Sequence, residues 1–323
     1  MKKTTSDRSK WSSPNPTAPV IESRVPFFLP ILRTTYNSKR QGRVKYETPW
    51  GWIELLGPVL TQEHRSILDM AMSMAIEKKM FKETGGMSLV FDTHKVKKAL
   101  GTKYSGGGGH KRFLQRLEEM RIVRLTVQNN KTGTTRISGI LDHFSYQFDP
   151  KKPDQFAGGI KTARSRIGDC LHEIRVSPSF MEFFREDLRV HYDPLVPEIV
   201  AIPDGTIRAI VLFFITHSKN CRFSIRQVME IIGAITEGQS ERMKREIMAK
   251  PEKFKADLER FGITIEGGNL CYERHPKVFF TNPPPPSSTG AVIDAEQAPE
   301  PISIKTALEA TLGGKRNPES PEK

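Results

Sequence analysis

The side chains with the clearest chemical meaning are the basic ones between Lys95 and Arg136. This stretch holds 11 Lys or Arg residues against two acids, Glu118 and Glu119, so its charge of +9 makes up most of the chain's formal +13. Lysine and arginine bind nucleic-acid phosphates, but basic surfaces also occur on proteins that bind no polyanion. Whether these charges bind nucleic acid or simply form a basic surface therefore depends on the structural elements that carry them.

A short sequence pattern occurs twice in the chain, 132 positions apart. In each copy a phenylalanine precedes a polar helix start, and an apolar helix face then ends at a glycine. The corresponding residues are Phe91, Val96, Leu100 and Gly101 in the first copy, and Phe223, Val228, Ile232 and Gly233 in the second. A polar cap, an apolar face and a terminal glycine predict a short helix in both places.

Both copies also have the same neighbours along the chain. Each is preceded by an apolar helix, followed by an amphipathic helix, and closed by a hairpin. The matching segments are residues 67–74 and 207–214 for the first helix, 113–120 and 254–261 for the second, and 122–148 and 263–272 for the hairpin. The first hairpin has its predicted turn at residues 129–133. This order is that of a winged helix, so we expect an α+β fold with two tandem winged-helix domains, although other small α+β domains could share it.

The basic residues of the first copy fall on the second helix of the motif, on the turn before it and on the hairpin. A helix-turn-helix with a wing presents these elements to a DNA groove and its phosphates. We therefore expect DNA contacts from Lys103, Tyr104, His110, Lys111, Arg112, Gln115, Arg116, Lys131 and Arg136.

The second copy carries its expected DNA contacts before a proline. They are Gln239, Ser240, Arg242, Lys244 and Arg245. Pro251 then interrupts the helical pattern. Either two helices meet there, with Pro251 at the first position of the later one, or a single helix kinks.

Residue patterns typical of catalysis are missing. The glycines at residues 106–109 invite a phosphate-loop interpretation but lack its Lys-Ser/Thr ending, so we interpret them as a flexible turn before a basic helix that begins near His110. No HExxH, GxSxG or paired-carboxylate pattern is present, and the six tyrosines lack the His pair of a nick-and-religate enzyme. Cys170, Cys221 and Cys271 have no spacing typical of a metal site or disulfide framework, which favours reduced core residues. We expect no enzyme activity, no cofactor and no metal.

Composition divides the chain into two modest domains with tails. Residues 1–30 are rich in Ser, Pro and Lys, and residues 281–323 are rich in Pro, so both are expected to be disordered. The first domain is expected at residues 31–148, an added inter-domain loop at 149–169, and the second domain at 170–280. The chain shows no apolar run of membrane-spanning length and no signal-peptide pattern, so we expect a cytoplasmic protein without a membrane partner.

The chain resembles plasmid replication initiators of the TrfA and RepA type. The similar segments are residues 29–40, 44–46 and 52–55, 113–125 and 242–245, in the family's order and spacing. The resemblance covers residues 29–275. It implies two winged-helix domains that bind repeated double-stranded origin sequences (iterons) as monomers, open the adjacent AT-rich DNA and recruit the host helicase and initiator proteins. It also implies storage as an inactive homodimer.

Two other functions fit parts of the same pattern. A transcriptional repressor or partition-type DNA-binding protein could use the same fold, and a primase or nuclease would belong to a different class. A DNA site made of tandem direct repeats would favour an initiator. Two unequal DNA-binding domains in one chain suit such an asymmetric site, whereas two-fold repressors place one DNA-binding domain per subunit on a palindrome.

The predicted hairpin at residues 44–56 is a candidate surface for the homodimer. Tyr46, Trp50, Trp52, Ile53 and Leu55 concentrate apolar and aromatic side chains there, and an uncovered strand edge can pair with another chain. Alternatively, these side chains pack on the helix expected over residues 61–80.

Overall fold

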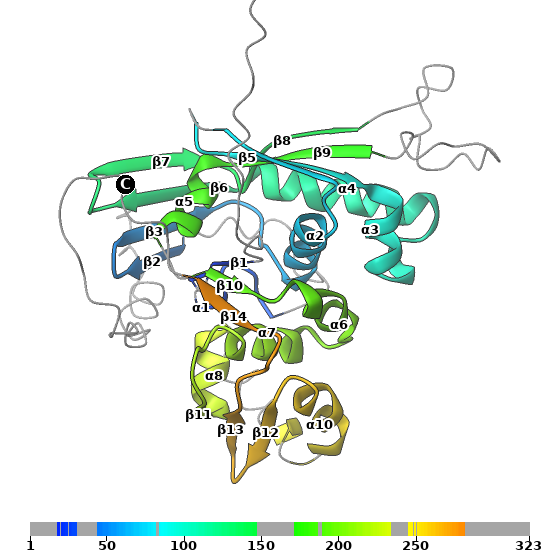
Figure 1. Ribbon diagram of the computed structural model, residues 1–323, viewed down its shortest axis with the longest axis vertical. Helices are drawn as coiled ribbons and strands as arrows, with labels where there is room; N and C mark the ends of the chain where they lie inside the picture. The colour runs from blue at the N-terminus through cyan, green and yellow to red at the C-terminus, as the bar shows by residue number, and fades with distance from the viewer. Residues whose placement is uncertain are drawn as a thin grey trace, which may run out of the picture.

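The computed structural model shows a mixed α+β protein whose described residues form four small antiparallel sheets, which confirms the expected α+β class (Figure 1). It describes residues 18–19, 21–24, 26–30, 44–81, 84–146, 171–186, 189–233, 245–247, 249 and 251–281. Most of the expected C-terminal tail, and the expected loop at 149–169, lie outside the described residues.

The first repeat consists of a helix, a strand, two helices and a hairpin. Its elements are α2 (Gln62–Ser73), β5 (Met87–Asp92), α3 (Thr93–Ala99), α4 (Gly106–Ile122), β8 (Leu141–Tyr146) and β9 (Leu171–Val176). Strand β9 lies between β5 and β8, so the three antiparallel strands have the order β5-β9-β8. Strand β4 (Glu77–Met80) extends this sheet beyond β5.

The second repeat has the same order of elements and the same strand pairing. Its elements are α7 (Gly205–Phe214), β11 (Cys221–Ser224), α8 (Ile225–Ile231), α10 (Pro251–Glu259), β12 (Ile263–Glu266) and β13 (Asn269–Tyr272). Strand β13 lies between β11 and β12. In both repeats, the strand before the short helix pairs with the last strand of the hairpin.

The short helices begin and end as the sequence pattern predicts. Asp92 caps α3 by accepting hydrogen bonds from the backbone N–H groups of the next turn, and the Ser224 hydroxyl caps α8 in the same way. Gly101 and Gly233 follow the two helices with φ angles of +94° and +76°. Glycine reaches this left-handed region without steric cost, so a glycine can end each helix at the corresponding position of its repeat.

The hairpin of the first repeat differs from the one expected. Strands β6 (Arg124–Asn129) and β7 (Thr134–Ser138) form the hairpin with its turn at residues 129–133, but they join β2 (Val44–Thr48) and β3 (Gly51–Leu56) in a separate sheet. The expected return strand over 134–148 is divided between β7 and β8. It breaks at Gly139, where a Cβ atom would lie 2.3 Å from the Arg121 carbonyl oxygen, so the chain bends closely around the end of α4.

Residues 171–186 belong with the first repeat rather than with the second domain, where we expected them. Strand β9 pairs with β5 and β8, and α5 (Pro178–Glu186) packs against β6 and β7. The segment expected as an inter-domain loop therefore connects β8 to β9 within the first repeat.

The N-terminal segment is another correction, because part of the tail expected at 1–30 is folded. Strand β1 (Ala18–Pro19) pairs with β10 (Arg189–His191), which also pairs with β14 (Phe279–Thr281), and α1 (Ile21–Arg24) follows. Phe27 and Phe28 are buried, and the Phe27 ring packs edge-on against the Phe183 ring with 5.3 Å between the ring centroids. Burial of these two adjacent aromatic side chains helps to stabilise the folded position of a segment whose average composition is polar.

The hairpin β2–β3 contributes to the core as well as to the surface. Trp50, Ile53 and Leu55 are buried, so these three side chains belong to the core, and the Trp50 ring centroid lies 6.0 Å from that of Phe183 on α5. Trp52 lies on the other face of β3, where the Lys45 Nζ is 4.8 Å from the ring centroid. Strand β2 is an outer strand of its sheet.

Truncation at the buried face of this sheet should destabilise the protein. Ile53 is fully buried, so Ile53→Ala should lower the free energy of unfolding by about 2 to 5 kcal/mol through lost burial and a residual cavity. Ile137, on β7 of the same sheet, is 55% exposed, and Ile137→Ala should change stability by about 0.5 kcal/mol or less. Urea denaturation of both variants measures the difference. Equal losses would contradict the assignment of these faces.

Candidate nucleic-acid interface

Helix α2 is the element on which the candidate interface is built. It is buried all round from Gln62 to Met72, with α4 packed on one side and with α7 and α6 (Val196–Ala201) packed against it as well. Polar side chains within it are therefore buried too and need partners. Thr61 caps the helix, and its hydroxyl accepts a hydrogen bond from the Glu63 N–H at 3.3 Å.

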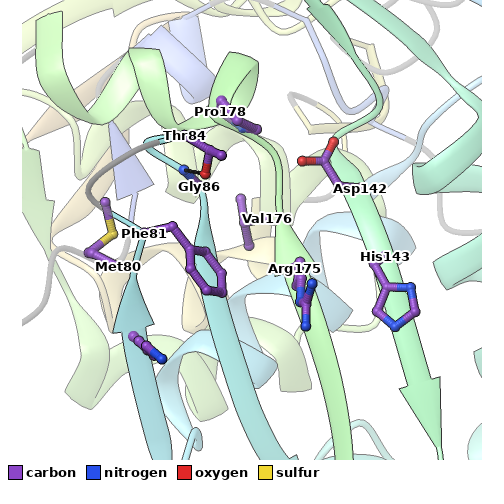
Figure 2. A pocket seen from close by; sticks show the side chains of 10 residues that line it. Met80, Phe81, Thr84, Gly86, Asp142, His143, Arg175, Val176 and Pro178 are labelled. Carbon is purple, nitrogen blue, oxygen red and sulfur yellow. Dashed lines mark hydrogen bonds between the residues drawn. The ribbon is translucent and has the colours of Figure 1, made fainter. Parts of the chain in front are cut away.

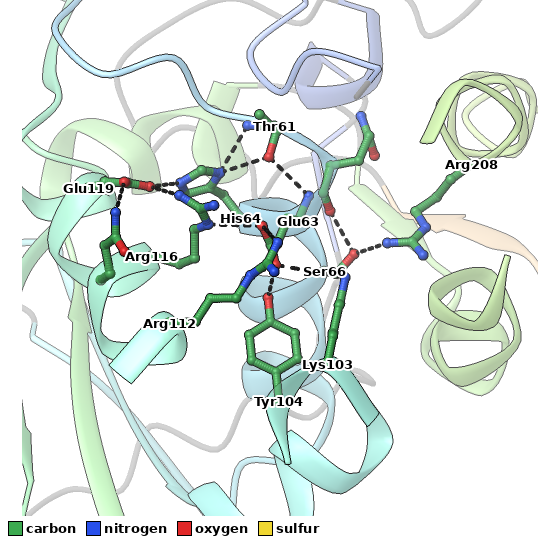
Figure 3. Close-up of polar contacts among 12 residues, drawn as sticks. Thr61, Glu63, His64, Ser66, Lys103, Tyr104, Arg112, Arg116, Glu119 and Arg208 are labelled. Carbon is green, nitrogen blue, oxygen red and sulfur yellow. Dashed lines mark hydrogen bonds and ion pairs between the residues drawn. The ribbon is translucent and has the colours of Figure 1, made fainter. Parts of the chain in front are cut away.

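The Glu63 carboxylate binds several side chains that the sequence assigned to DNA (Figure 3). Arg112 donates to it through Nε at 2.7 Å and Nη2 at 2.9 Å, and Arg116 donates through Nε at 2.9 Å. The Tyr104 hydroxyl donates at 2.6 Å, and the Lys103 Nζ lies 3.8 Å away. Burial alone would raise the pKa of Glu63, but the hydrogen bonds from Arg112 and Tyr104 outweigh it and hold that pKa below its usual value. Glu63 is thus a fixed anion that attaches α4 and the short helix η1 (Thr102–Tyr104) to α2.

A second carboxylate completes the attachment. Glu119 on α4 accepts a hydrogen bond from Arg116 Nη1 at 2.5 Å and contacts His64 Nε2 on α2 at 2.7 Å. Burial acts to raise the pKa of Glu119, but the hydrogen bonds from His64 and Arg116 prevail and hold it at about 2. We name these seven residues the Glu63 cluster: Glu63, His64, Lys103, Tyr104, Arg112, Arg116 and Glu119.

The cluster changes the expected role of two DNA-contact residues. Tyr104 is fully buried and Arg116 is 5% exposed, so both are interior residues rather than part of a DNA-facing surface. Lys103 and Arg112 lie at the rim, with side chains 32% and 33% exposed. The sequence placed Arg112 and Arg116 on the polar face of a helix, and Lys103 and Tyr104 on the turn before it. It could not show that the partner of that face is a carboxylate 49 positions earlier in the chain.

His110 is also an interior residue, and the glycines before it belong to the helix. The ring centroid of His110 lies 6.0 Å from that of His172, and burial, together with the charge of Lys97, lowers the pKa of His110 to about 4. Helix α4 begins at Gly106, so residues 106–109 form its first turn rather than a flexible connection. At Gly109 a Cβ atom would lie 2.2 Å from the Tyr104 carbonyl carbon, which explains why glycine is needed there.

The exposed part of α4 retains two of the predicted DNA contacts. Lys111 and Gln115 lie on its solvent face, and Lys95 and Lys98, which the sequence did not single out, are exposed on neighbouring α3. The remaining two first-repeat residues lie on the β6–β7 hairpin, which extends away from α4 (Figure 1). Lys131 is exposed there, and Arg136 contacts Glu182 at 3.4 Å. The structure therefore does not bring all the predicted contacts onto one surface.

The predicted contacts of the second repeat are described only in part. Arg245 is exposed in a helical segment, whereas Gln239, Ser240, Arg242 and Lys244 lie outside the described residues. Helix α10 begins at Pro251, which matches the alternative with proline at the first position of the later helix. Lys253 and Lys255 on α10 are exposed, whereas Phe254 on the same helix is buried.

The described residues hold few features typical of other kinds of site. Within the described ranges, no group of three His, Cys, Asp or Glu side chains is arranged to hold a metal ion. Cys221 and Cys271 are partly buried thiols, and Cys170 is outside the described residues. No helix in the described part of the chain is long and apolar enough to cross a membrane.

Comparison with protein-family models, with curated proteins and with solved structures returned no match. The function must therefore be inferred from the repeated topology and from the placement of charged residues.

Glu119 should make stability depend on pH in acid. Its pKa is about 2 in the folded protein and about 4.3 in an unfolded chain. Its contribution to the free energy of unfolding is therefore complete above pH 4.3 and disappears as the pH falls through 2. Between pH 5 and 2 the free energy of unfolding of the wild type should fall by roughly 2 to 3 kcal/mol more than that of Glu119→Gln. Urea denaturation at both pH values measures the difference.

Glu118 provides a matched control on the same helix. It pairs with Arg121 at the surface, where solvent screens the interaction, so Glu118→Gln should keep the wild-type pH dependence almost unchanged. If Glu119→Gln also kept the full wild-type dependence, the contacts of Glu119 with His64 and Arg116 would not exist in solution.

Proposed function

We propose that this protein is a plasmid replication initiator that binds direct repeats in double-stranded origin DNA through two winged-helix domains. The observation that carries the proposal is the repeated topology. The same order of helix, strand, helix, helix and hairpin recurs with the same strand orders, β5-β9-β8 and β11-β13-β12. In a winged helix this pairing places the helix before the hairpin where it can enter a DNA groove. Those helices are α4 and α10.

The charges around α4 suit a DNA backbone. Lys95, Lys98 and Lys111 are exposed, and the rim residues Lys103 and Arg112 add two partly exposed cations. The Glu63 cluster fixes α4 against α2, so the exposed side chains of α4 are presented on a rigid element. Rigid presentation lowers the entropy lost on binding.

The two repeats offer unequal surfaces to DNA. The first carries the Glu63 cluster and an additional hairpin, whereas the second has exposed lysines on α10 and an exposed Arg245. Two different readers in one chain suit an asymmetric direct repeat. This favours an initiator over the alternative of a repressor or partition-type protein.

The other parts of the proposal come from the resemblance to plasmid initiators. They are the opening of AT-rich DNA, the recruitment of host helicase and initiator proteins, and the inactive homodimer. The cytoplasmic location is proposed from the hydropathy of the sequence instead, which shows no apolar run of membrane-spanning length. For the homodimer, the outer strand β2 and the face with Trp52 are the candidate surfaces, because Trp50, Ile53 and Leu55 are buried.

Footprinting on the DNA upstream of the protein's own gene tests the function. Protection of tandem direct repeats beside an AT-rich stretch is the expected result. Protection of a promoter palindrome would assign the protein to the repressor class. Metal-dependent nicking or primer synthesis by the purified protein would assign it to the enzyme class.

Lys111 should contribute to binding through phosphate contact alone. Lys111→Gln should weaken binding to all duplex sequences alike and reduce the slope of log affinity against log salt by about 0.9. The slope is measured by fluorescence anisotropy over a salt series. Lys219→Gln, which removes an exposed charge from the turn between α7 and β11, is the control and should leave the slope unchanged. An unchanged slope in Lys111→Gln would exclude this face of α4 from the interface.

A further inference from the structure

A pocket with a volume of about 510 Å³ lies on the sheet β4-β5-β9-β8, apart from the Glu63 cluster (Figure 2). Its lining includes Lys79, Phe81, Asp142, His143 and Arg175. The strand register places Lys79 opposite Ser88, and Ser88 opposite Arg175. Because Leu89 and Ile174 alternate with these residues and are fully buried, the charged side chains lie on the face that does not pack on the helices.

Phe81 gives the pocket an aromatic surface between two cations. The Lys79 Nζ lies 5.8 Å from its ring centroid, and the Arg175 Cζ lies 5.5 Å from it. The ring is half-buried, at the pocket rather than in the protein interior. An aromatic face beside basic side chains is the arrangement on which unpaired nucleic-acid bases stack, with the cations taking the phosphates.

Arg175 is held in position before any ligand arrives. Its Nε donates to Glu173 Oε1 at 3.0 Å, and the Ser88 hydroxyl donates to the same oxygen at 2.8 Å. His143 is the register partner of Arg175 on β8, and Figure 2 shows Arg175 between Phe81 and His143. A guanidinium that is already oriented loses less conformational entropy when it binds an anion.

Asp142 adds an acceptor on the β8 side of the pocket. A carboxylate there can accept hydrogen bonds from the N–H groups on the edge of a base. A ring, two cations and one acceptor together provide the stacking, phosphate and base-edge contacts that a nucleotide needs. A paired base is enclosed in the duplex stack and cannot enter such a pocket, so the base must be unpaired.

We propose that this pocket binds an unpaired nucleotide, with its base stacked on Phe81 and its base edge at Asp142, and with phosphates at Arg175 on one side of the ring and at Lys79 on the other. The volume falls within the range of about 300 to 1,000 Å³ typical of small-molecule sites. The same chemistry is offered by a free mononucleotide and by one nucleotide of single-stranded DNA. The site is separate from the duplex-binding helices and does not depend on the proposed function.

Isothermal titration calorimetry of the full chain tests the site with deoxynucleoside monophosphates, a short single-stranded oligonucleotide and a glutamate-rich peptide. Binding of the monophosphates identifies a mononucleotide site, and binding of the oligonucleotide alone identifies a single-strand site; both support the proposal. Binding of the peptide alone would overturn it and make the pocket a protein-docking surface. Binding of none of the probes would also overturn it.

Variants separate the pocket from other basic surfaces. Phe81→Ala should weaken nucleotide binding roughly 5- to 150-fold, the effect of losing one base–aromatic stack, whereas Phe81→Tyr should retain it. Lys79→Gln should lower the salt slope for the oligonucleotide by about 0.7. Lys219→Gln removes an exposed lysine from the turn between α7 and β11 and should have no effect.

Two further measurements guard against a folding defect. The thermal melting and duplex affinity of Phe81→Ala should match the wild type. If that variant melts early, Phe81→Tyr and Lys79→Gln decide the question. Nucleotide affinity that is unchanged in Phe81→Ala, or a salt slope that is unchanged in Lys79→Gln, would overturn the proposal.

Discussion

The attachment of α4 to α2 through the Glu63 carboxylate is the interaction on which the candidate DNA interface depends. A buried carboxylate is costly unless its oxygens are paired, and here Tyr104, Arg112 and Arg116 all donate to it. Because three donors from one segment meet a single acceptor on α2, the rotation of α4 about its own axis is fixed. That rotation turns Arg116 inward and leaves Lys111 and Gln115 outward.

Helix α2 uses its other polar residues to hold the rest of the protein. Arg208 of α7 donates to the Ser66 hydroxyl and to the carbonyl oxygens of Val200 and Ile202, which joins the second repeat to α2. One turn of α2 therefore contacts α4 through Glu63 and α7 through Ser66. Arg65 of the same turn donates to the Ser23 hydroxyl of the N-terminal segment. The two repeats and the N-terminal segment therefore share one buried polar centre.

The two repeats are alike in topology but differ in what surrounds them. In the second, β12 and β13 follow α10 directly and pair with β11. In the first, the hairpin β6–β7 is inserted after α4 and joins β2 and β3, so the pairing with β5 is made by β8 and β9. The strand order is the same in both repeats despite the insertion, because one edge of β5 pairs with β9 rather than with the inserted hairpin. This asymmetry gives a single chain two surfaces of different shape and charge.

The sequence by itself determined the features that depend on neighbouring residues. The caps at Asp92 and Ser224, the glycine stops at Gly101 and Gly233, and the order of helices and strands follow from local hydrogen bonding and periodicity. Only the tertiary structure decided which hairpin pairs with β5, that Phe27 and Phe28 are buried, and that Arg112 and Arg116 meet Glu63. The reason is physical. A helix face or strand edge that is polar or apolar in sequence does not specify its partner, and these partners lie tens of residues away along the chain.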